Sequence, residues 1–218
     1  MGEPARSRML IALLDGRALP AGELARISGV SAQSASGHLS KLVDGGLLAV
    51  QREGRHRYYR IAKPEVAHAL EALGAISTVP RLPSVPRDRQ TEALCTVRSC
   101  YDHLAGRVAV ELAGALESSR VIAPSGERNY ELGPHGKQWF TKLGLDVDAL
   151  RHSRRSFARQ CLDWTERKPH VAGALGAALC SRLLDLGWIA RRPRTRALRI
   201  TQRGARELHA RFRIAIPA

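Results

Sequence analysis

Four side chains in the second half of the chain are of the types that bind soft metal ions. Cys100 and His103 stand three residues apart, and Cys161 and His170 form a second thiol and imidazole pair further along. Two thiolate sulfurs and two imidazole nitrogens make a tetrahedral set suited to zinc or another soft divalent metal. Because the pairs are distant in sequence, this predicted site requires that the two segments meet in the fold.

The sequence leaves other interpretations of these residues open. The histidines could cap helices or hydrogen-bond internally while the cysteines fill small core spaces. A thiolate at Cys100 or Cys161, held at a low pKa by a neighbouring His or Arg, would instead be oxidised reversibly. A small organic ligand is a further alternative. In the metal case, Asp102 or Asp163 would orient one of the histidines.

The two pairs belong to a degenerate internal repeat. His103-Leu-Ala-Gly106 recurs as His170-Val-Ala-Gly173 at an offset of 67, and Tyr130 to Gly136 resembles Leu198 to Gly204 at an offset of 68. Each copy predicts a helix that begins at the His-x-Ala-Gly motif, then a β-hairpin and a closing helix. Both histidines would then occupy equivalent helix starts and face one cleft.

The second copy also resembles a stretch near the N-terminus. Lys41 to Ala49 matches Arg182 to Ala190 at an offset of 141, and a basic hairpin ending in Arg-Ile follows each. Residues 182 to 213 hold 10 Arg against 2 acidic residues. However, Val171 to Leu184 is mostly Ala, Gly, Leu and Val, which pack on protein and cannot hydrogen-bond to base edges. This copy is therefore expected to be a scaffold, a dimerisation surface or a non-specific DNA clamp, and not a second sequence reader.

The earlier stretch, residues 31 to 61, combines a polar helix with a basic hairpin. Small and polar side chains fill the start of the helix, while Leu39 and Leu42 recur at helical spacing and would face a core. Gly45-Gly46 ends the helix, and two strands are expected on either side of a basic tip at 52 to 55. Short polar side chains suit close approach to base edges, and a basic hairpin suits phosphates.

The flanking residues complete the pattern. One helix is expected from Arg6 to Leu14 and a short second one from Leu19-Pro20-Ala21, with proline in its first turn. Ser28-Gly29-Val30 forms the turn, and Ser31 is a natural N-cap for the next helix. A further helix, Glu65 to Ile76, follows the hairpin. This order is that of a winged helix-turn-helix.

Residues 5 to 76 resemble the ArsR family of bacterial winged-helix repressors, on the basis of ELARISGVSAQSASGHLSKLVDGGLL followed by REGRHRYYRI. The resemblance implies a homodimer whose recognition helices enter successive major grooves of an imperfect palindromic operator in double-stranded DNA, and an effector that weakens binding. By position, it implies DNA contacts from the recognition helix and the wing, namely Ser31, Gln33, Ser34, Ser36, His38, Lys41, Arg52, Arg55 and Arg57.

The chain departs from the family at its known sensor sites. Where arsenic sensors carry a cysteine cluster this chain has Gly22 to Ile27, and residues 1 to 94 contain no cysteine. On the helix after the wing, where zinc sensors place ligands, it offers only Glu65, His68 and Glu71, a poor zinc set that is more typical of a solvent-facing stripe. Any effector is therefore expected to bind in the C-terminal half.

Composition supports a polyanionic partner. The 218 residues carry a formal charge of +15, which favours nucleic acid. The charge is uneven, because residues 1 to 77 have 10 basic against 7 acidic residues and the remainder has 25 against 13.

Four cysteines do not make a disulfide scaffold, and no apolar run is long enough to span a membrane, so we expect a cytoplasmic protein without a membrane partner.

Enzyme signatures are missing from the sequence. It contains no G-x-x-x-x-G-K-[ST], G-x-S-x-G or H-E-x-x-H motif, and we expect no catalytic residues. The expected fold class is mainly α with small β-hairpin wings (α+β). We predict a winged helix-turn-helix DNA-binding domain over 1–77, a Pro-rich linker over 78–89 and a winged-helix-like sensing or dimerisation region over 90–213. We therefore predict a sequence-specific DNA-binding regulator, a dimeric repressor that a metal ion or a thiol oxidant releases from DNA. The alternatives are a regulator that responds to a small organic ligand, or a non-catalytic interaction module without its own effector.

Overall fold

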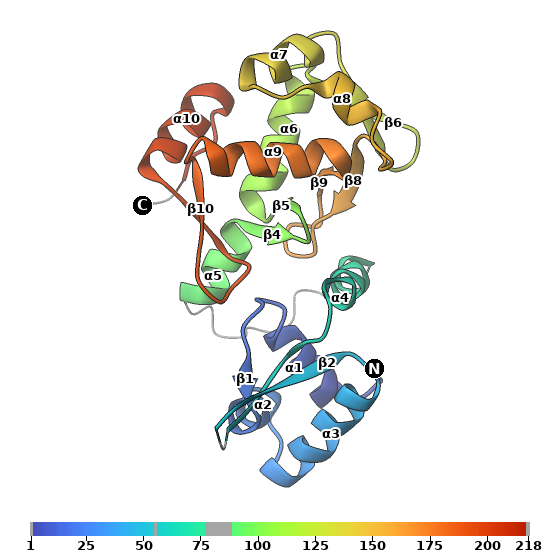
Figure 1. Cartoon of the computed structure of the whole chain (residues 1–218), viewed down its shortest axis with the longest axis vertical. Helices are drawn as coiled ribbons and strands as arrows, with labels where there is room; N and C mark the ends of the chain where they lie inside the picture. The colour runs from blue at the N-terminus through green and yellow to red at the C-terminus, as the bar shows by residue number, and fades with distance from the viewer. Residues whose placement is uncertain (1, 55, 77–88, 217–218) are drawn as a thin grey trace. The chain divides into compact units, whose positions relative to one another are not determined.

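The computed structural model describes residues 2–54, 56–76 and 89–216, which divide into two units (Figure 1). One unit comprises Met1–Leu73 with Pro193–Thr195, and the other comprises Gly74–Arg192 with Arg196–Ala218. Nearly all of the predicted Pro-rich linker lies outside the described residues. Helices combine with small antiparallel sheets, which confirms the α+β fold class with hairpin wings.

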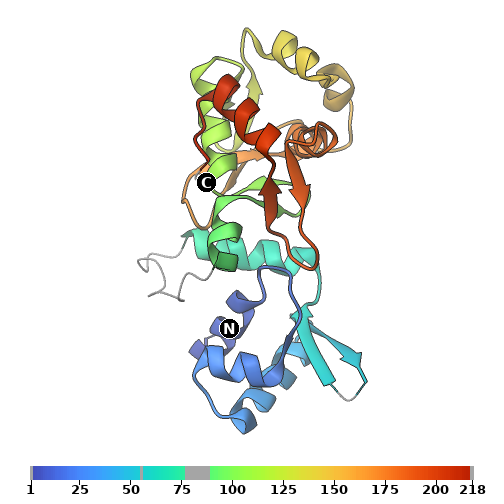
Figure 2. The same cartoon turned by 90° about the vertical axis from the view of Figure 1, so that its left-hand side faces the viewer.

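The N-terminal unit is a winged helix-turn-helix. Its elements are α1 (Pro4–Ala12), β1 (Leu19–Pro20), α2 (Ala21–Ser28), α3 (Ala32–Asp44), β2 (Leu48–Glu53), β3 (His56–Ile61) and α4 (Pro64–Ile76), whose end belongs to the other unit. The strands form an antiparallel sheet in the order β1-β3-β2. Figure 2 shows the β2–β3 hairpin projecting from the helices of this unit as a wing.

Local sequence explains how α3 is positioned. Gly29 ends α2 at a φ of 70°, a left-handed conformation that glycine adopts without strain. Ser31 then caps α3, since its hydroxyl accepts a hydrogen bond from Ser34 N at 3.1 Å. Leu39 and Leu42 face the core of the unit, as predicted, so the polar side of the helix faces outward.

The C-terminal unit repeats one order of elements. After α5 (Arg89–Thr96), the first copy comprises β4 (Arg98–Cys100), β5 (His103–Ala105), α6 (Arg107–Ser118), β6 (Ile122–Ser125), β7 (Asn129–Leu132) and α7 (Gly136–Leu143). After α8 (Val147–Arg151), the second comprises β8 (Arg159–Leu162), β9 (Pro169–Ala172), α9 (Gly173–Asp185), β10 (Ile189–Arg191), β11 (Leu198–Ile200) and α10 (Gln202–Phe212). Each copy is thus hairpin, helix, hairpin, helix.

The predicted helix starts in this unit are wrong. His103 lies in β5 and His170 in β9; α6 begins after the glycine of its His-x-Ala-Gly motif, and α9 begins at that glycine. Those glycines, Gly106 and Gly173, have φ values of +89° and +79°. The positive φ changes the direction of the backbone between the strand and the helix. The motif therefore joins a strand to a helix, and the histidines project from hairpins.

One hydrophobic core joins the two copies. It includes Leu112 and Leu116 from α6, Leu175 and Leu183 from α9, and Phe140 from α7. Helices α6 and α9 cross at the centre of the unit (Figure 1) and together line one small internal cavity. The two first hairpins, β4–β5 and β8–β9, are therefore carried on a shared rigid centre.

Candidate metal centre and DNA-binding surface

Each first hairpin of the C-terminal unit presents one thiol beside one imidazole. Cys100 and His103 are direct cross-strand partners in β4–β5, and Cys161 and His170 are direct partners in β8–β9. Cross-strand partners in an antiparallel pair project to the same face of the hairpin. The two copies of the repeat therefore supply equivalent pairs.

All four predicted ligands come together, and we call this group the thiol–imidazole cluster: Cys100, His103, Cys161 and His170. Their ligand atoms all lie within 4.8 Å of one another. The rings of His103 and His170 stack at 5.1 Å between centroids. Cys161 is half-buried and the other three are buried. The condition set by the sequence, that two distant segments meet, is satisfied.

Each histidine of the cluster has an aspartate on its Nδ1 side. Asp102 Oδ1 lies 3.2 Å from His103 Nδ1, and Asp163 Oδ2 lies 3.8 Å from His170 Nδ1. These aspartates follow the two cysteines at the same spacing, so Cys-x-Asp also recurs in the repeat. The hydrogen bond between His103 Nδ1 and Asp102 favours the tautomer that leaves Nε2 available to a metal. Asp163 is too far from His170 Nδ1 for a hydrogen bond and acts there through its charge.

The Nε2 atoms of His103 and His170 are buried without a hydrogen-bond partner among the described residues. Buried polar atoms in folded proteins nearly always have partners, and an exception calls for a missing ligand, ion or water. Two such nitrogens beside two thiols fit a metal of the zinc type. The donor set of this chain is therefore suited to such an ion.

Asp163 holds the two hairpins together. Its Oδ2 accepts hydrogen bonds from Arg98 Nη2 at 2.9 Å and from Gly106 N at 2.7 Å. Its Oδ1 accepts from the hydroxyl and backbone N–H of Thr165. Burial alone would raise the pKa of Asp163, but the Arg98 charge and these hydrogen bonds hold it well below its usual range. The carboxylate is thus ionised beside His170.

The electrostatics around the other histidine are similar. Burial acts to lower the pKa of His103, yet its interactions with Cys100 and Asp102 outweigh burial and raise that pKa. Asp102 itself is paired with Arg155 near the surface. Burial raises the pKa of Asp102, but Arg155 and His103 together lower it below its ordinary value. Each aspartate is therefore paired with its own arginine, Asp163 with Arg98 and Asp102 with Arg155.

Sequence reasoning named both aspartates but missed Arg98 and its role. Arg98 is the largest fully buried side chain in its unit, and its guanidinium stacks over Trp164 at 5.3 Å. Its partner lies 65 residues along the chain, so no local pattern reveals it. The repeated Cys-x-Asp spacing, by contrast, was visible in the sequence and would have placed the two aspartates as equivalents.

The recognition helix presents the predicted polar face. Ala35, Leu39 and Leu42 are buried along one side of α3. The exposed side carries five of the predicted DNA-contacting residues, Ser31, Gln33, Ser34, Ser36 and Lys41. This arrangement leaves short polar side chains accessible at the start of the helix, where base edges are contacted in helix-turn-helix proteins.

The remaining predicted DNA contacts are less uniform. His38 is half-buried, with Nδ1 3.6 Å from a Glu3 carboxylate oxygen. Arg52 and Arg57 are exposed and lie directly opposite each other across the β2–β3 ladder. Arg55 lies outside the described residues. The contacts of these residues with DNA stay predictions.

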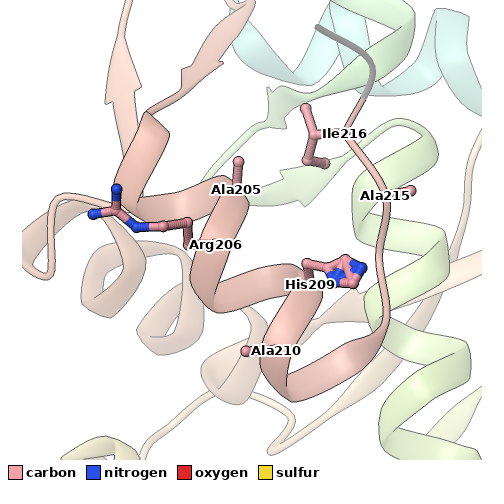
Figure 3. Close-up of a pocket in the computed structure, with 6 residues that line it drawn as sticks. All are labelled: Ala205, Arg206, His209, Ala210, Ala215 and Ile216. Atoms are coloured by element: carbon pink, nitrogen blue, oxygen red, sulfur yellow. The ribbon is translucent and has the colours of Figure 1, made fainter.

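Neither helix α4 nor the groove along α10 offers a comparable set of ligands. On α4, Glu71 is buried while Glu65 and His68 are exposed, so the three do not share the solvent-facing stripe expected from sequence. Among the described residues, the thiol–imidazole cluster is the one group with metal-binding geometry. Figure 3 shows an open groove along α10 lined by Ala205, Arg206, His209, Ala210, Ala215 and Ile216. It is mostly small and apolar, and lacks such a donor set.

Known proteins agree with this architecture. Helix-turn-helix domains, as a family, match residues 1–51. One bacterial relative aligns along most of the chain, with 44% identity over 204 residues, 94% of this chain and 90% of that protein. The chain therefore belongs to the helix-turn-helix transcriptional regulators. That relative is YdfF of Bacillus subtilis strain 168, described as an uncharacterized HTH-type transcriptional regulator.

Solved structures similar to this chain match a smaller part of it. The cadmium metal-sensor CMTR from Mycobacterium tuberculosis is 36% identical, and the match covers 39% of this chain and 91% of that one at a TM-score of 0.30. The homodimeric winged helix-turn-helix DNA-binding domain of Mb0332 from Mycobacterium bovis, a possible ArsR-family regulator, is 31% identical. That match covers 34% of this chain and 68% of that one at a TM-score of 0.33.

Among the helices that the structure describes, none has the length and apolar character of a membrane span.

Proposed function

We propose that the chain is a homodimeric transcriptional repressor that binds an imperfect palindromic operator through α3 and the wing. A soft divalent metal of the zinc type binds the thiol–imidazole cluster and weakens DNA binding. The observation that carries the sensing part is the convergence of two Cys/His pairs, one from each copy of the repeat, within 4.8 Å.

The geometry of the cluster suits four-coordinate binding. Zinc–sulfur and zinc–nitrogen bonds of about 2.3 and 2.0 Å imply ligand atoms roughly 3.3 to 3.8 Å apart in a tetrahedron. Small side-chain adjustments within the present spacing would reach those distances. A divalent ion supplies the charge that balances two thiolates, so the filled cluster is neutral, as burial favours. Four protein ligands complete the shell, which suits binding rather than turnover.

Space beside the cluster argues against an organic effector there. The internal cavity between α6 and α9 is lined by apolar residues, among them Leu104, Val171 and Gly176. Its volume is about 10 Å³, which is roughly the least that one water requires. A drug-sized ligand needs several hundred cubic ångströms, on the order of 300 or more. A metal ion fits the available space better.

Metal analysis of freshly purified protein tests the sensing part. We expect about one zinc per chain, and loss of that metal in a C100S/H103A variant. C180S is the matched control, because Cys180 is a buried thiol outside the cluster, and it should keep the metal. Cobalt substitution adds a second readout, the thiolate-to-cobalt charge-transfer band. Protein without metal, and a variant indistinguishable from wild type on zinc addition, would contradict the proposal.

The DNA-binding part is tested separately. Selection from a random duplex pool should yield a palindrome whose half-sites lie about one helical turn apart, as two-fold symmetric dimers require. Light scattering should show a dimer, and zinc should raise the Kd for the selected duplex in wild type but not in C100S/H103A. A monomer, or a Kd that zinc leaves unchanged, would contradict the dimer or the metal response respectively.

Thiol oxidation is the second candidate for sensing, since the sulfurs of Cys100 and Cys161 belong to the same compact group. A two-electron oxidant such as diamide would join them in a disulfide, with loss of both thiol protons to the reduced oxidant. Peptide mass mapping after diamide treatment should then find a Cys100–Cys161 linkage. If this disulfide forms and the oxidised protein releases DNA, while zinc neither binds the cluster nor releases DNA, redox sensing replaces metal sensing.

A further inference from the structure

The two copies of the C-terminal unit share one fold but differ in charge. Residues 182–213 of the second copy hold 10 Arg and 2 acidic residues, a net charge of +8, whereas residues 114–145, at an offset of 68, hold 4 basic and 3 acidic residues, a net charge of +1. Both segments form the end of a helix, a hairpin and a closing helix. The excess of arginine is therefore not required by this fold.

A glycine in each closing helix shows which residues of the two copies are equivalent. An added Cβ on Gly136 would lie 2.4 Å from Val121 O, and one on Gly204 would lie 1.9 Å from Trp188 O. Contacts this short exclude any side chain, so each closing helix packs against the residue that precedes its hairpin. Ile122 pairs with Leu132 and Ile189 with Ile200, so the offset of 68 relates equivalent positions in the second strand and the closing helix.

Three arginines near that glycine define what we call the α10 basic surface: Arg199, Arg203 and Arg206. Their equivalents in the first copy are, in order, Glu131, His135 and Gln138, and all six residues are exposed. The side chains of the three arginines make no hydrogen bond or ion pair within the described parts of the chain. In Figure 3, Arg206 extends from α10 away from Ala215 and Ile216. They are available to a partner.

The same segment carries further exposed arginines. Within residues 182–213 of this unit they are Arg191, Arg192, Arg211 and Arg213. Of the two acids, Glu207 is already paired with Arg211. All basic residues of the segment are Arg, whose planar guanidinium matches a phosphate with two parallel hydrogen bonds.

We infer that the α10 basic surface is a second DNA-binding site, which contacts the phosphate backbone of duplex DNA without reading its sequence. Base readout is not expected at this place because α9, the helix in the recognition position, exposes only Ser181 and Asp185, both at its C-terminal end. The inference rests on the proposed function to the extent that DNA is the polyanion this regulator binds. It adds a non-specific contribution to affinity.

The salt dependence of binding to a 30-bp random duplex, measured with the full-length protein, tests the inference. Log affinity falls with log salt by about 0.9 for each phosphate contact. The test variant R199E/R203H/R206Q carries the residues of the first copy, which the same fold already accommodates. We expect its slope to be about 2 to 3 smaller than that of wild type. R199K/R203K/R206K should restore most of the slope.

The matched control changes equal charge elsewhere. R128E/R154Q/R159Q alters three exposed arginines of the same unit by the same total charge, and its slope should stay close to that of wild type. An unchanged slope in the test variant, or an equal fall in the control, overturns the inference. So does arginine-dependent binding to phosphatidylglycerol vesicles with the DNA slope unchanged, which would identify a lipid surface as the partner.

Failure of the proposed function would look different. The test variant should still prefer a duplex selected by wild type over the random duplex, because α3 is intact. A Q33A/S36A variant should lose that preference while keeping the salt slope. If wild type selects no sequence, reading by α3 fails, yet the comparison of slopes still decides whether the α10 basic surface binds DNA.

Discussion

Arg98 and Asp163 form an ion pair from which solvent is excluded, with side chains 1% and 0% exposed. Asp163 also accepts the backbone N–H of Gly106, so one carboxylate links the β8–β9 hairpin to the start of α6. Buried ion pairs add little net stability over apolar packing, but removing one partner leaves a buried charge alone. The pair therefore fixes how the hairpins meet more than it adds stability.

Asp163→Asn should lower the free energy of unfolding by about 3 to 5 kcal/mol, because Arg98 stays buried without its counter-charge. Urea denaturation of the metal-free protein at pH 7 measures this. Asp148→Asn is the control, since Asp148 pairs with Lys137 on the exposed surface and its loss should leave the free energy of unfolding nearly unchanged. A similar small loss for Asp163→Asn would show that the buried pair is not required.

Gly106→Ala should destabilise the C-terminal unit and weaken metal binding together. Gly106 has a φ of +89°, and an added Cβ would lie 2.7 Å from Cys95 O. The unfavourable backbone alone costs about 1 to 3 kcal/mol, and the backbone collision adds to it. Gly114→Ala on α6 is the control: its Cβ meets nothing within 4 Å, so stability should rise by about 0.5 to 1 kcal/mol. Thermal unfolding with and without zinc compares the two.

Cys180 should resist alkylation in the folded protein. Burial raises the pKa of its thiol to about 11, and the thiolate is the reactive form. At pH 8 the thiol is therefore protonated, and its reactivity should increase about tenfold per pH unit until the pH approaches that value. Peptide mapping after iodoacetamide treatment should find the half-buried Cys95 labelled first. Equal rates at the two thiols would contradict this assignment.

Substitutions on the recognition helix and on the wing should separate specificity from affinity. Q33A/S36A should relax preference for the selected duplex, with about 1 to 3 kcal/mol less discrimination per lost base contact. R52Q/R57Q should weaken binding to all duplexes alike, because wing arginines are expected at phosphates. Competition binding with selected and random duplexes measures both. Full discrimination by Q33A/S36A would show that α3 does not read bases.

The N-terminal unit was predictable because its determinants are local. Leucines at helical spacing, Gly29 in a left-handed turn and Ser31 as an N-cap each act within a few residues. The hairpins that carry the thiol–imidazole cluster were missed because their strands have only three or four residues. In β5, all three residues from His103 to Ala105 are buried, so the alternation that reveals a strand is absent.

The cluster itself was predicted from residue types and the repeat, although its histidines were assigned to helix starts. The equivalence of His103 and His170 was enough to bring them together, because it did not depend on the element that carries them. The buried partnership of Arg98 with Asp163 left no trace in sequence, since it joins positions 65 residues apart. Long-range charge pairing is decided by the folded chain alone.

The symmetry of the cluster has a consequence for how such a site could arise. Each copy supplies one cysteine and one histidine from the same place in its first hairpin. A single copy of the repeat would therefore supply only two of the four ligands. A shorter ancestor with a single copy could have completed the shell only by pairing with a second molecule. Duplication within one gene would then have turned an intersubunit site into an internal one, independent of protein concentration.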